Sequence, residues 1–152
     1  MSRSTTTSLQ VLALVSLAAV LSACDTFRVT FPMANQVFSQ DFQIVDGRLR
    51  ILVRFDRAVD LASLIPRQNV VLETEVDRNA DIRVIALSPT EIRIESVNTF
   101  GELFVFDPDG HFALILSGDG PQAIRDSAGT PLDGDGDGSP GGVYRTGLGL
   151  LG

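Results

Sequence analysis

The strongest structural signal in the chain is residues 42–55, which read Phe42-Gln43-Ile44-Val45-Asp46-Gly47-Arg48-Leu49-Arg50-Ile51-Leu52-Val53-Arg54-Phe55. The Asp46-Gly47 pair lies between two apolar runs and favours a tight hairpin turn, because both residues tolerate positive φ. The second arm alternates two sets of residues, Leu49, Ile51, Val53 and Phe55 on one face and Arg48, Arg50, Leu52 and Arg54 on the other. This alternation predicts a central core strand with one buried face and one solvated face, its arginines paired with neighbouring acids.

Further short strands are expected downstream at even spacing. They are residues 69–76, 81–87, 91–97, 112–116 and 143–146, each with alternating apolar and polar positions. In 81–87, Ile85 and Leu87 add apolar residues to the second face and predict burial on both sides near the end of that strand. Asp60 is expected to cap a single helical turn before Pro66. Because no helix of ordinary length is expected after the N-terminal segment, we predict an all-β fold, a sandwich.

Three stretches of the body resemble the bacterial Ig-like domains that carry a C-terminal D-x-x-G-N/T-x-L signature. They are residues 51–55 followed by Val59-Asp60, residues 111–118, and Ile124-Arg125-Asp126-Ser127-Ala128-Gly129-Thr130-Pro131-Leu132, the closest match. The resemblance covers about the last hundred residues. It implies a seven-stranded antiparallel Ig-like sandwich, here assigned to residues 41–152, and it implies no particular activity.

The N-terminal segment has the features of a helical secretory signal peptide. Arg3 supplies positive charge, residues 11–21 are almost wholly apolar, and small residues follow at Ser22 and Ala23. The apolar run is shorter than the roughly 20 residues that a membrane-spanning helix needs. Leu21-Ser22-Ala23-Cys24 resembles the lipobox of bacterial lipoproteins position by position. The resemblance implies cleavage between Ala23 and Cys24 and a diacylglycerol thioether on Cys24.

Residues 24–40 connect this anchor to the predicted sandwich. Residues 27–31 alternate apolar and polar and are interrupted by Pro32, so the segment is either a tether or a first edge strand. The domain organisation predicted is therefore a signal peptide over 1–23, a tether or edge strand over 24–40, and the sandwich over 41–152.

Composition limits the classes of partner. The chain has 19 acidic and 12 basic residues, all of the latter arginine, and a formal net charge of −7. This acidic excess argues against a nucleic-acid partner, because phosphate binding needs a basic patch. Since Cys24 is the only cysteine, no disulfide can form within the chain, and packing must hold the domain together.

The best candidate ligand site is Asp133-Gly134-Asp135-Gly136-Asp137-Gly138, inside a loop expected at 133–142. Carboxylates at alternate positions between glycines can fold round Ca²⁺, as in the first half of an EF-hand loop. Tyr144 occupies the twelfth position, where an EF-hand has a bidentate Glu, so the match is partial. Asp119 and Asp126 complete the ligand shell only if the fold brings them close. The alternative interpretation is an acidic, solvated connection without a metal.

An enzymatic interpretation has few residues to support it. His111, the single histidine, follows a turn and has no accompanying G-x-S-x-G nucleophile motif. Two acidic pairs have the residue types of a glycosidase, Glu73 with Glu75 and Asp107 with Asp109. On a strand face and in a turn, however, these residues lack a cleft. We therefore predict that the protein is not an enzyme.

The sequence therefore supports three functional hypotheses. The first is a non-catalytic, lipid-anchored envelope protein whose Ig-like domain acts in adhesion or envelope assembly, by binding a protein or surface polymer through its sheet edges or loops. The anchor would lie in the inner or the outer membrane, with the domain facing the periplasm or the exterior. The alternative is a calcium-binding envelope module that uses Asp133, Asp135 and Asp137. An envelope hydrolase is the third.

Overall fold

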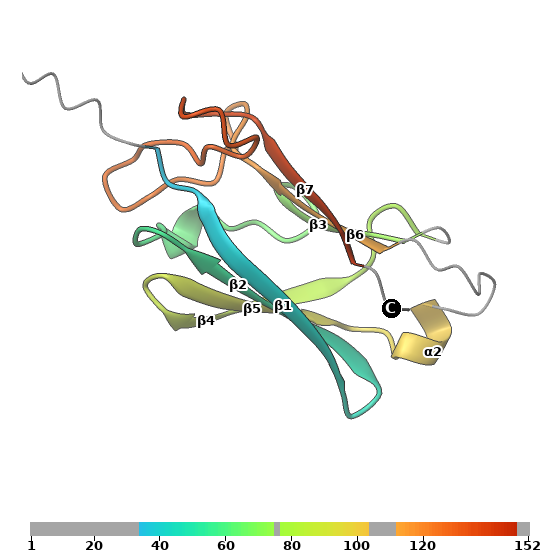
Figure 1. The fold of residues 1–152 in the computed structure, drawn as a ribbon. Coiled ribbons are helices and arrows are strands. Elements are labelled where there is room, and N and C mark those ends of the chain that lie inside the picture. Colours follow the sequence, from blue (N-terminus) through green and yellow to red (C-terminus); the bar gives the residue numbers. More distant parts are fainter. Residues whose placement is uncertain (1–33, 75–76, 104–111, 149–152) are drawn as a thin grey trace, which may run out of the picture. The chain divides into compact units, whose positions relative to one another are not determined.

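Two antiparallel sheets, packed face to face, make up the part of the chain that the computed structural model describes, residues 34–74, 77–103 and 112–148 (Figure 1). One sheet has the order β1-β2-β5-β4 and consists of β1 (Val37–Val45), β2 (Arg48–Phe55), β5 (Glu91–Ser96) and β4 (Ile82–Ser88). The other has the order β3-β6-β7 and consists of β3 (Val70–Glu73), β6 (Phe112–Ser117) and β7 (Val143–Leu148). The predicted all-β sandwich is thus confirmed.

The predicted hairpin is present, with β1 and β2 as its arms. Asp46 and Gly47 form the turn with φ of 53° and 73°, the left-handed conformation that a two-residue hairpin turn requires. The strands pair antiparallel in register from Ser39–Arg54 to Val45–Arg48. β2 is an inner strand of its sheet, as predicted, and β1 is an edge strand that begins at Val37. Residues 37–40, which the sequence left open between a tether and an edge strand, therefore belong to β1.

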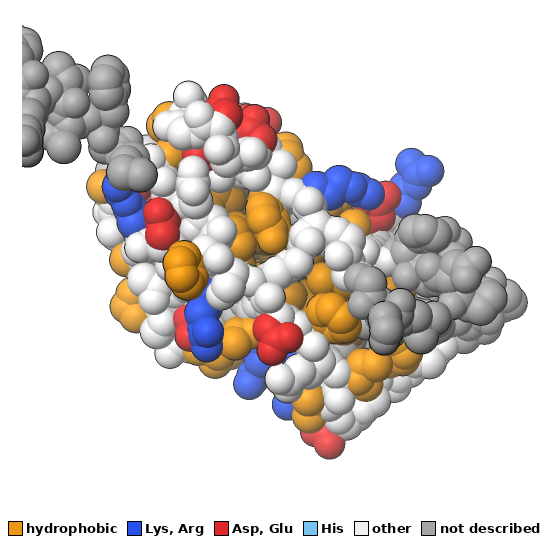
Figure 2. All heavy atoms as spheres, in the orientation of Figure 1, with side chains coloured by type: hydrophobic (Ala, Val, Ile, Leu, Met, Phe, Trp, Pro, Cys, Tyr) orange, Lys and Arg blue, Asp and Glu red, His pale blue; other side chains and the backbone are white. Residues whose placement is uncertain are grey.

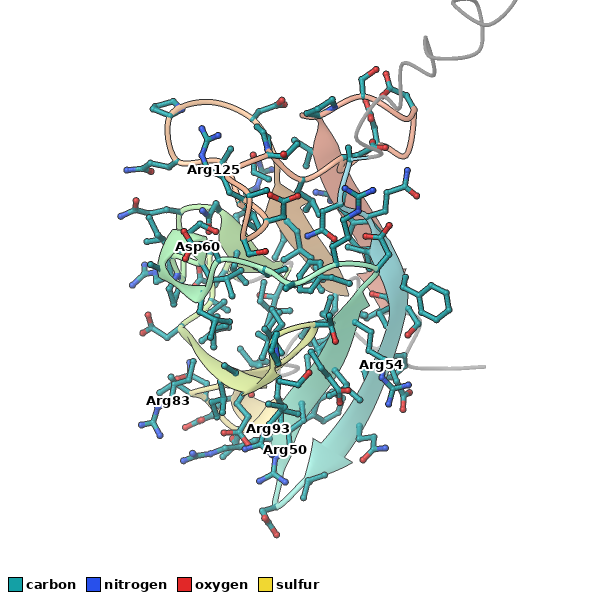
Figure 3. All side chains as sticks on the ribbon, turned by 90° about the vertical axis from the view of Figure 1, so that its left-hand side faces the viewer. Arg50, Arg54, Asp60, Arg83, Arg93 and Arg125 are labelled. Atoms are coloured by element: carbon teal, nitrogen blue, oxygen red, sulfur yellow. The ribbon has the colours of Figure 1, made fainter. Side chains whose placement is uncertain are left out.

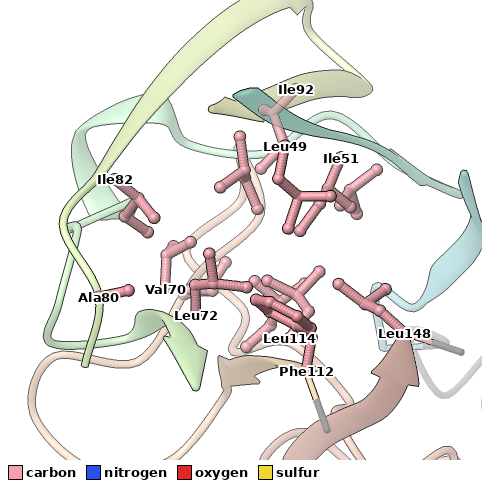
Figure 4. Close-up of a cluster of buried hydrophobic side chains, with 14 of the residues drawn as sticks. Leu49, Ile51, Val70, Leu72, Ala80, Ile82, Ile92, Phe112, Leu114 and Leu148 are labelled. Carbon is pink, nitrogen blue, oxygen red and sulfur yellow. The ribbon is translucent and has the colours of Figure 1, made fainter. Parts of the chain in front are cut away.

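The core lies between the two sheets (Figure 4). The inward side chains of β2 are at most 4 % exposed, because every second residue of that strand faces the other sheet. Partners from the other strands complete the cluster, among them Val70, Leu72, Ile92, Ile94, Leu114 and Leu116. The ring of Phe112 stacks on that of Phe100, with 6.1 Å between centroids. Phe100 belongs to a one-turn helix, α2 (Phe100–Leu103).

The prediction for the end of β4 was wrong. Leu87 is 46 % exposed, and Ile85 is half-buried, so the second face of β4 is not covered. The reason is that β4 belongs to a two-layer sandwich, in which one face of each sheet packs on the core and the other meets solvent. A register shift between Ala86 and Ser88 also makes Leu87 the extra residue of a β-bulge.

Polar contacts join the two sheets and fix the connections. Gln40 Nε2 on β1 donates to Thr146 Oγ1 on β7 over 2.6 Å and links one edge of each sheet. The 3₁₀ turn η2 (Leu61–Ser63) has Asp60 as its predicted cap, with Asp60 Oδ1 accepting from Ala62 N.

Within the described ranges, no helix has the length and apolar character needed to cross a membrane.

Candidate site in the 133–142 loop

A turn immediately upstream positions the 133–142 loop. Asp126 is 3 % exposed, and its Oδ1 accepts hydrogen bonds from the backbone N–H groups of Ala128 (2.9 Å) and Thr130 (2.8 Å). Gly129 has a φ of 85°, which a side chain would strain. The turn sends the chain back so that Leu132 N donates to Ile124 O, and Leu132 is fully buried. These contacts give a physical role to the Asp, Gly and Leu of the D-x-x-G-T-x-L stretch.

Asp133 follows Leu132 into the interior and is 2 % exposed. Its Oδ1 accepts from Gly136 N (2.8 Å) and Asp137 N (3.2 Å). Its Oδ2 accepts from Gly138 N (2.9 Å) and from Gln36 Nε2 (2.6 Å). An ionised carboxylate offers about four lone-pair sites, so these donors account for all of them. The carboxylate thereby folds the loop around itself.

The hydrogen bonds also set the charge state of Asp133. Burial raises the pKa of this carboxyl, but hydrogen bonds from Gln36, Gly138 and Gly136 outweigh that effect. The net pKa of Asp133 is lowered from its ordinary value. Asp133 therefore stays ionised at neutral pH although it is buried.

The three predicted ligand residues do meet. Carboxylate oxygens of Asp133, Asp135 and Asp137 lie within 4.8 Å of one another, with Asp135 and Asp137 exposed. Asp137 Oδ1 accepts from Ser139 N over 2.7 Å, and the carboxylate of Asp135 lies against Gly142. Hard oxygen ligands at this spacing suit Ca²⁺. A cation here would compete with the N–H groups that already bind Asp133.

The other two acids considered for the shell contact different groups. Asp126 is engaged in its own turn, and Asp119 Oδ1 accepts from Gly142 N over 2.7 Å. Neither belongs to the group of described carboxylates that lie within 4.8 Å of one another. Tyr144, at the twelfth loop position, lies on β7.

The 133–142 loop also holds the first described residues of the chain, a contact that the sequence did not reveal. Ala34 is 2 % exposed and Asn35 is fully buried. Asp133 N donates to Asn35 O (2.8 Å), and Gln36 Nε2 donates to Asp133 Oδ2. The same residues are also bonded to the chain that leaves β2. Gln36 and Asp56 form a pair of bonds, in which Gln36 N donates to Asp56 Oδ1 (2.7 Å) and Asp56 N donates to Gln36 O (3.0 Å). Arg57 N donates to Asn35 Oδ1 (3.1 Å). Residues 34–36, the N-terminal clamp, are thus held between the 133–142 loop and the end of β2.

The remaining predicted site residues are mostly outside the described ranges. These are Ala23, Cys24, Glu75, Asp107, Asp109 and His111. Glu73 is described, and its Oε2 accepts from Arg145 Nη1 over 2.5 Å across β3 and β7. The pair lines a hollow of about 490 Å³. The carboxylate of Glu73 is thus paired with an arginine on β7, over the intervening strand β6.

Comparisons with known proteins identify no family for this chain. No protein-family model matches the chain, and no curated protein sequence matches it. Among solved structures, the chain is similar to the crystal structure of the N-terminal part of the bacterial S-layer protein SbsC. The two are 17 % identical with a TM-score of 0.48, and the similarity covers 92 % of this chain and 27 % of that chain.

Proposed function

We propose that the protein is a non-catalytic, lipid-anchored binding module of the bacterial cell envelope. In this proposal Cys24 carries the lipid after cleavage behind Ala23, and the sandwich binds a protein or surface polymer in adhesion or assembly. The observation that carries it is the Leu21-Ser22-Ala23-Cys24 sequence at the end of an apolar run. Two or more acyl chains on one cysteine would give stable membrane attachment.

The N-terminal clamp supports an anchored role. Residues 34–36 are the described residues nearest in sequence to Cys24, and Asn35 and Gln36 are hydrogen-bonded both to the 133–142 loop and to the end of β2. A pull that reaches these residues has to break both sets of bonds before it reaches β1.

We further propose that the sandwich is of the Ig-like type. In the constant-type Ig arrangement, strands A, B, E and D form one sheet and C, F and G the other. Counting β1 to β7 as A to G, the observed orders β1-β2-β5-β4 and β3-β6-β7 fit that arrangement. The fit supports a module whose faces and loops serve recognition. It does not identify the partner, because this architecture hosts many functions.

Metabolic labelling tests the anchor. Cells expressing the full chain are grown with radiolabelled palmitate, and wild type is compared with Cys24→Ser. Because Cys24 is the only cysteine, label is expected on wild type and absent from the variant, with the wild-type protein in the membrane fraction. Equal label on both proteins would refute the proposal.

Calcium binding is the second candidate, favoured by the 4.8 Å grouping of Asp133, Asp135 and Asp137. Here Asp135 and Asp137 would supply exposed carboxylates, and Asp133 would bind the cation in place of some of the backbone N–H groups that now donate to it. Calorimetric titration of the full chain with CaCl₂ is expected to release or absorb heat and to raise Tm, and Asp135→Asn/Asp137→Asn is expected to abolish both. No heat and no change of Tm in wild type would remove this candidate.

A further inference from the structure

Asp-Gly pairs occur repeatedly in this chain, and the structure holds them in different ways. Six pairs occur in the sequence, and five of them lie in the described ranges: Asp46-Gly47, Asp119-Gly120, Asp133-Gly134, Asp135-Gly136 and Asp137-Gly138. An Asp before Gly can convert to isoaspartate, because the glycine nitrogen is unhindered by a side chain and can close a succinimide ring with the Asp carboxyl. The reaction therefore depends on whether the Gly N–H and the Asp carboxyl of a pair are held by other groups.

The three pairs of the 133–142 loop are held at their glycine nitrogens. Gly134 N donates to a carbonyl oxygen across the loop over 2.7 Å. Gly136 N and Gly138 N donate to the two carboxylate oxygens of Asp133, over 2.8 Å and 2.9 Å. Figure 2 shows acidic side chains exposed at the end of the sandwich where β7 begins, yet Asp133 itself is buried. Each glycine nitrogen must give up a hydrogen bond before it can attack, so the loop is protected although two of its three carboxyl groups are exposed.

The two remaining pairs differ at the carboxyl group. Asp119 Oδ1 accepts from Gly142 N over 2.7 Å, which holds that carboxyl in place. Asp46, in the turn between β1 and β2 (Figure 1), has a side chain that is 85 % exposed, and its ion pair with Arg50 is long, with 3.7 Å between Oδ2 and Nη2. Such an exposed pair holds a carboxyl weakly. Within the described ranges Gly47 N donates no hydrogen bond, so Asp46-Gly47 is the pair in which neither group is held by a short contact.

We propose that Asp46 is the aspartate of the described chain that converts to isoaspartate, and that Asp133 keeps the 133–142 loop from the same reaction. Gly47 N attacks Cγ of the protonated Asp46 carboxyl and loses its proton, and the Cγ–O bond breaks with loss of a water molecule. Water then adds back to the succinimide. Opening at Cγ restores Asp46, whereas opening at the α-carbonyl leaves the chain running through Cγ as isoaspartate, with no net change of mass. The proposal is independent of the membrane anchor.

The product does not fit the turn that the hairpin requires. Asp46 and Gly47 form a two-residue turn that sets the register of β1 and β2 from the Val45–Arg48 pair onwards. An isoaspartate adds a carbon atom to the backbone of this turn. The same turn is bonded to α2, because Phe100 N donates to Gly47 O. Since β2 is an inner strand of its sheet, conversion at Asp46 is expected to loosen the hairpin and to lower the Tm of the domain.

Incubation of the purified full chain in warm neutral buffer, followed by trypsin digestion and peptide mapping, tests the proposal. Because trypsin cuts after arginine, Asp46-Gly47 falls in peptide 29–48, Asp119-Gly120 in 94–125 and the three loop pairs in 126–145. Electron-transfer fragmentation assigns isoaspartate to a residue within each peptide.

Asp133→Ala removes the carboxylate that holds the loop. Asp126→Ala is the matched control, because Asp126 is also a buried acid that accepts from backbone N–H groups, but in a different turn.

Wild type is expected to accumulate isoaspartate at Asp46 before any other described aspartate. Asp133→Ala is expected to raise isoaspartate at Asp135 and Asp137 about fivefold, the factor that corresponds to one backbone hydrogen bond, and to leave the rate at Asp46 unchanged. Asp126→Ala is expected to keep the loop at the wild-type level. The inference is overturned if wild type reacts first at Asp119 or in the loop, if no isoaspartate forms, if Asp133→Ala leaves the loop unchanged, or if Asp126→Ala raises the loop signal as much as Asp133→Ala does.

Discussion

Asp126 and Asp133 are seven positions apart, and both are buried acids that fold the backbone around them. They differ in which oxygens they use. Asp126 accepts both of its hydrogen bonds on Oδ1, whereas Asp133 accepts two on each oxygen. An asparagine has one side-chain carbonyl oxygen. It can therefore accept the two hydrogen bonds that Asp126 accepts on Oδ1, but only two of the four that Asp133 accepts on both oxygens.

Asp133→Asn is therefore expected to lower the free energy of unfolding by about 1–3 kcal/mol, since the amide that replaces one oxygen faces donors it cannot accept from. Urea denaturation followed by circular dichroism measures it. Asp135→Asn is the matched control and is expected to change stability by less than about 0.5 kcal/mol, because Asp135 is exposed. Equal effects of the two substitutions would contradict the role given to Asp133.

Asp126→Asn is expected to leave the free energy of unfolding nearly unchanged, whereas Asp126→Ala leaves the N–H groups of Ala128 and Thr130 without their acceptor. The alanine variant is expected to lose about 1–3 kcal/mol of stability. Thermal unfolding of the two variants side by side makes the comparison. If Asp126→Ala unfolds at the same temperature as wild type, the turn does not depend on this carboxylate.

The lowered pKa of Asp133 makes its contribution depend on pH. In acid the unfolded chain takes up this proton before the folded chain does, so protonation favours unfolding. The stabilisation is complete above the ordinary carboxyl pKa, about 3.9, and is lost as pH falls through the lower folded value. The stability difference between wild type and Asp133→Asn is therefore expected to shrink below about pH 4. Glu102, whose pKa is lowered by hydrogen bonds from Thr99, is present in both proteins, so it does not affect the comparison. A difference that stays constant from pH 6 to pH 2 would be the contrary result.

At the level of the elements, the chain has no room for a side chain at Gly118, the residue that follows β6. A Cβ on Gly118 would overlap the backbone carbonyl oxygen of Leu132 and lie 2.9 Å from its carbonyl carbon. Gly118→Ala is expected to cost about 1–3 kcal/mol, because backbone must move to relieve the overlap. Gly147→Ala in β7 is the control, since nothing lies within 4 Å of its Cβ position. Differential scanning calorimetry should show a fall of Tm for Gly118→Ala alone.

The strands show how far local pattern predicts structure. The hairpin was predictable because Asp46-Gly47 and the alternation after it are local signals, and both are present. Burial at the end of β4 was mispredicted because a run of apolar residues cannot reveal that its strand belongs to a two-layer sandwich, in which the outer face of each sheet meets solvent. The N-terminal clamp gave no signal at all, since Gln36 and Asp133 are 97 residues apart in sequence.

The candidate site was predictable in composition but not in contacts. The spacing of Asp133, Asp135 and Asp137 did indicate that their carboxylates meet. It could not show that Asp133 is saturated by donors, because three of these come from the loop's own backbone and one from Gln36. The arginines of β2, Arg50 and Arg54 among them (Figure 3), were predicted to form a solvated face paired with neighbouring acids, and the ion pairs of Arg50 with Glu95 and of Arg54 with Glu91 confirm this.

In the whole molecule, the proposed membrane attachment depends on where the mature chain begins and what it carries there. Mass spectrometry of the N-terminal peptide from membrane-extracted protein tests this most directly. The account predicts a first residue of Cys24, with the mass of a diacylglyceryl group on its sulfur. A peptide that begins elsewhere, or an unmodified Cys24, would contradict it.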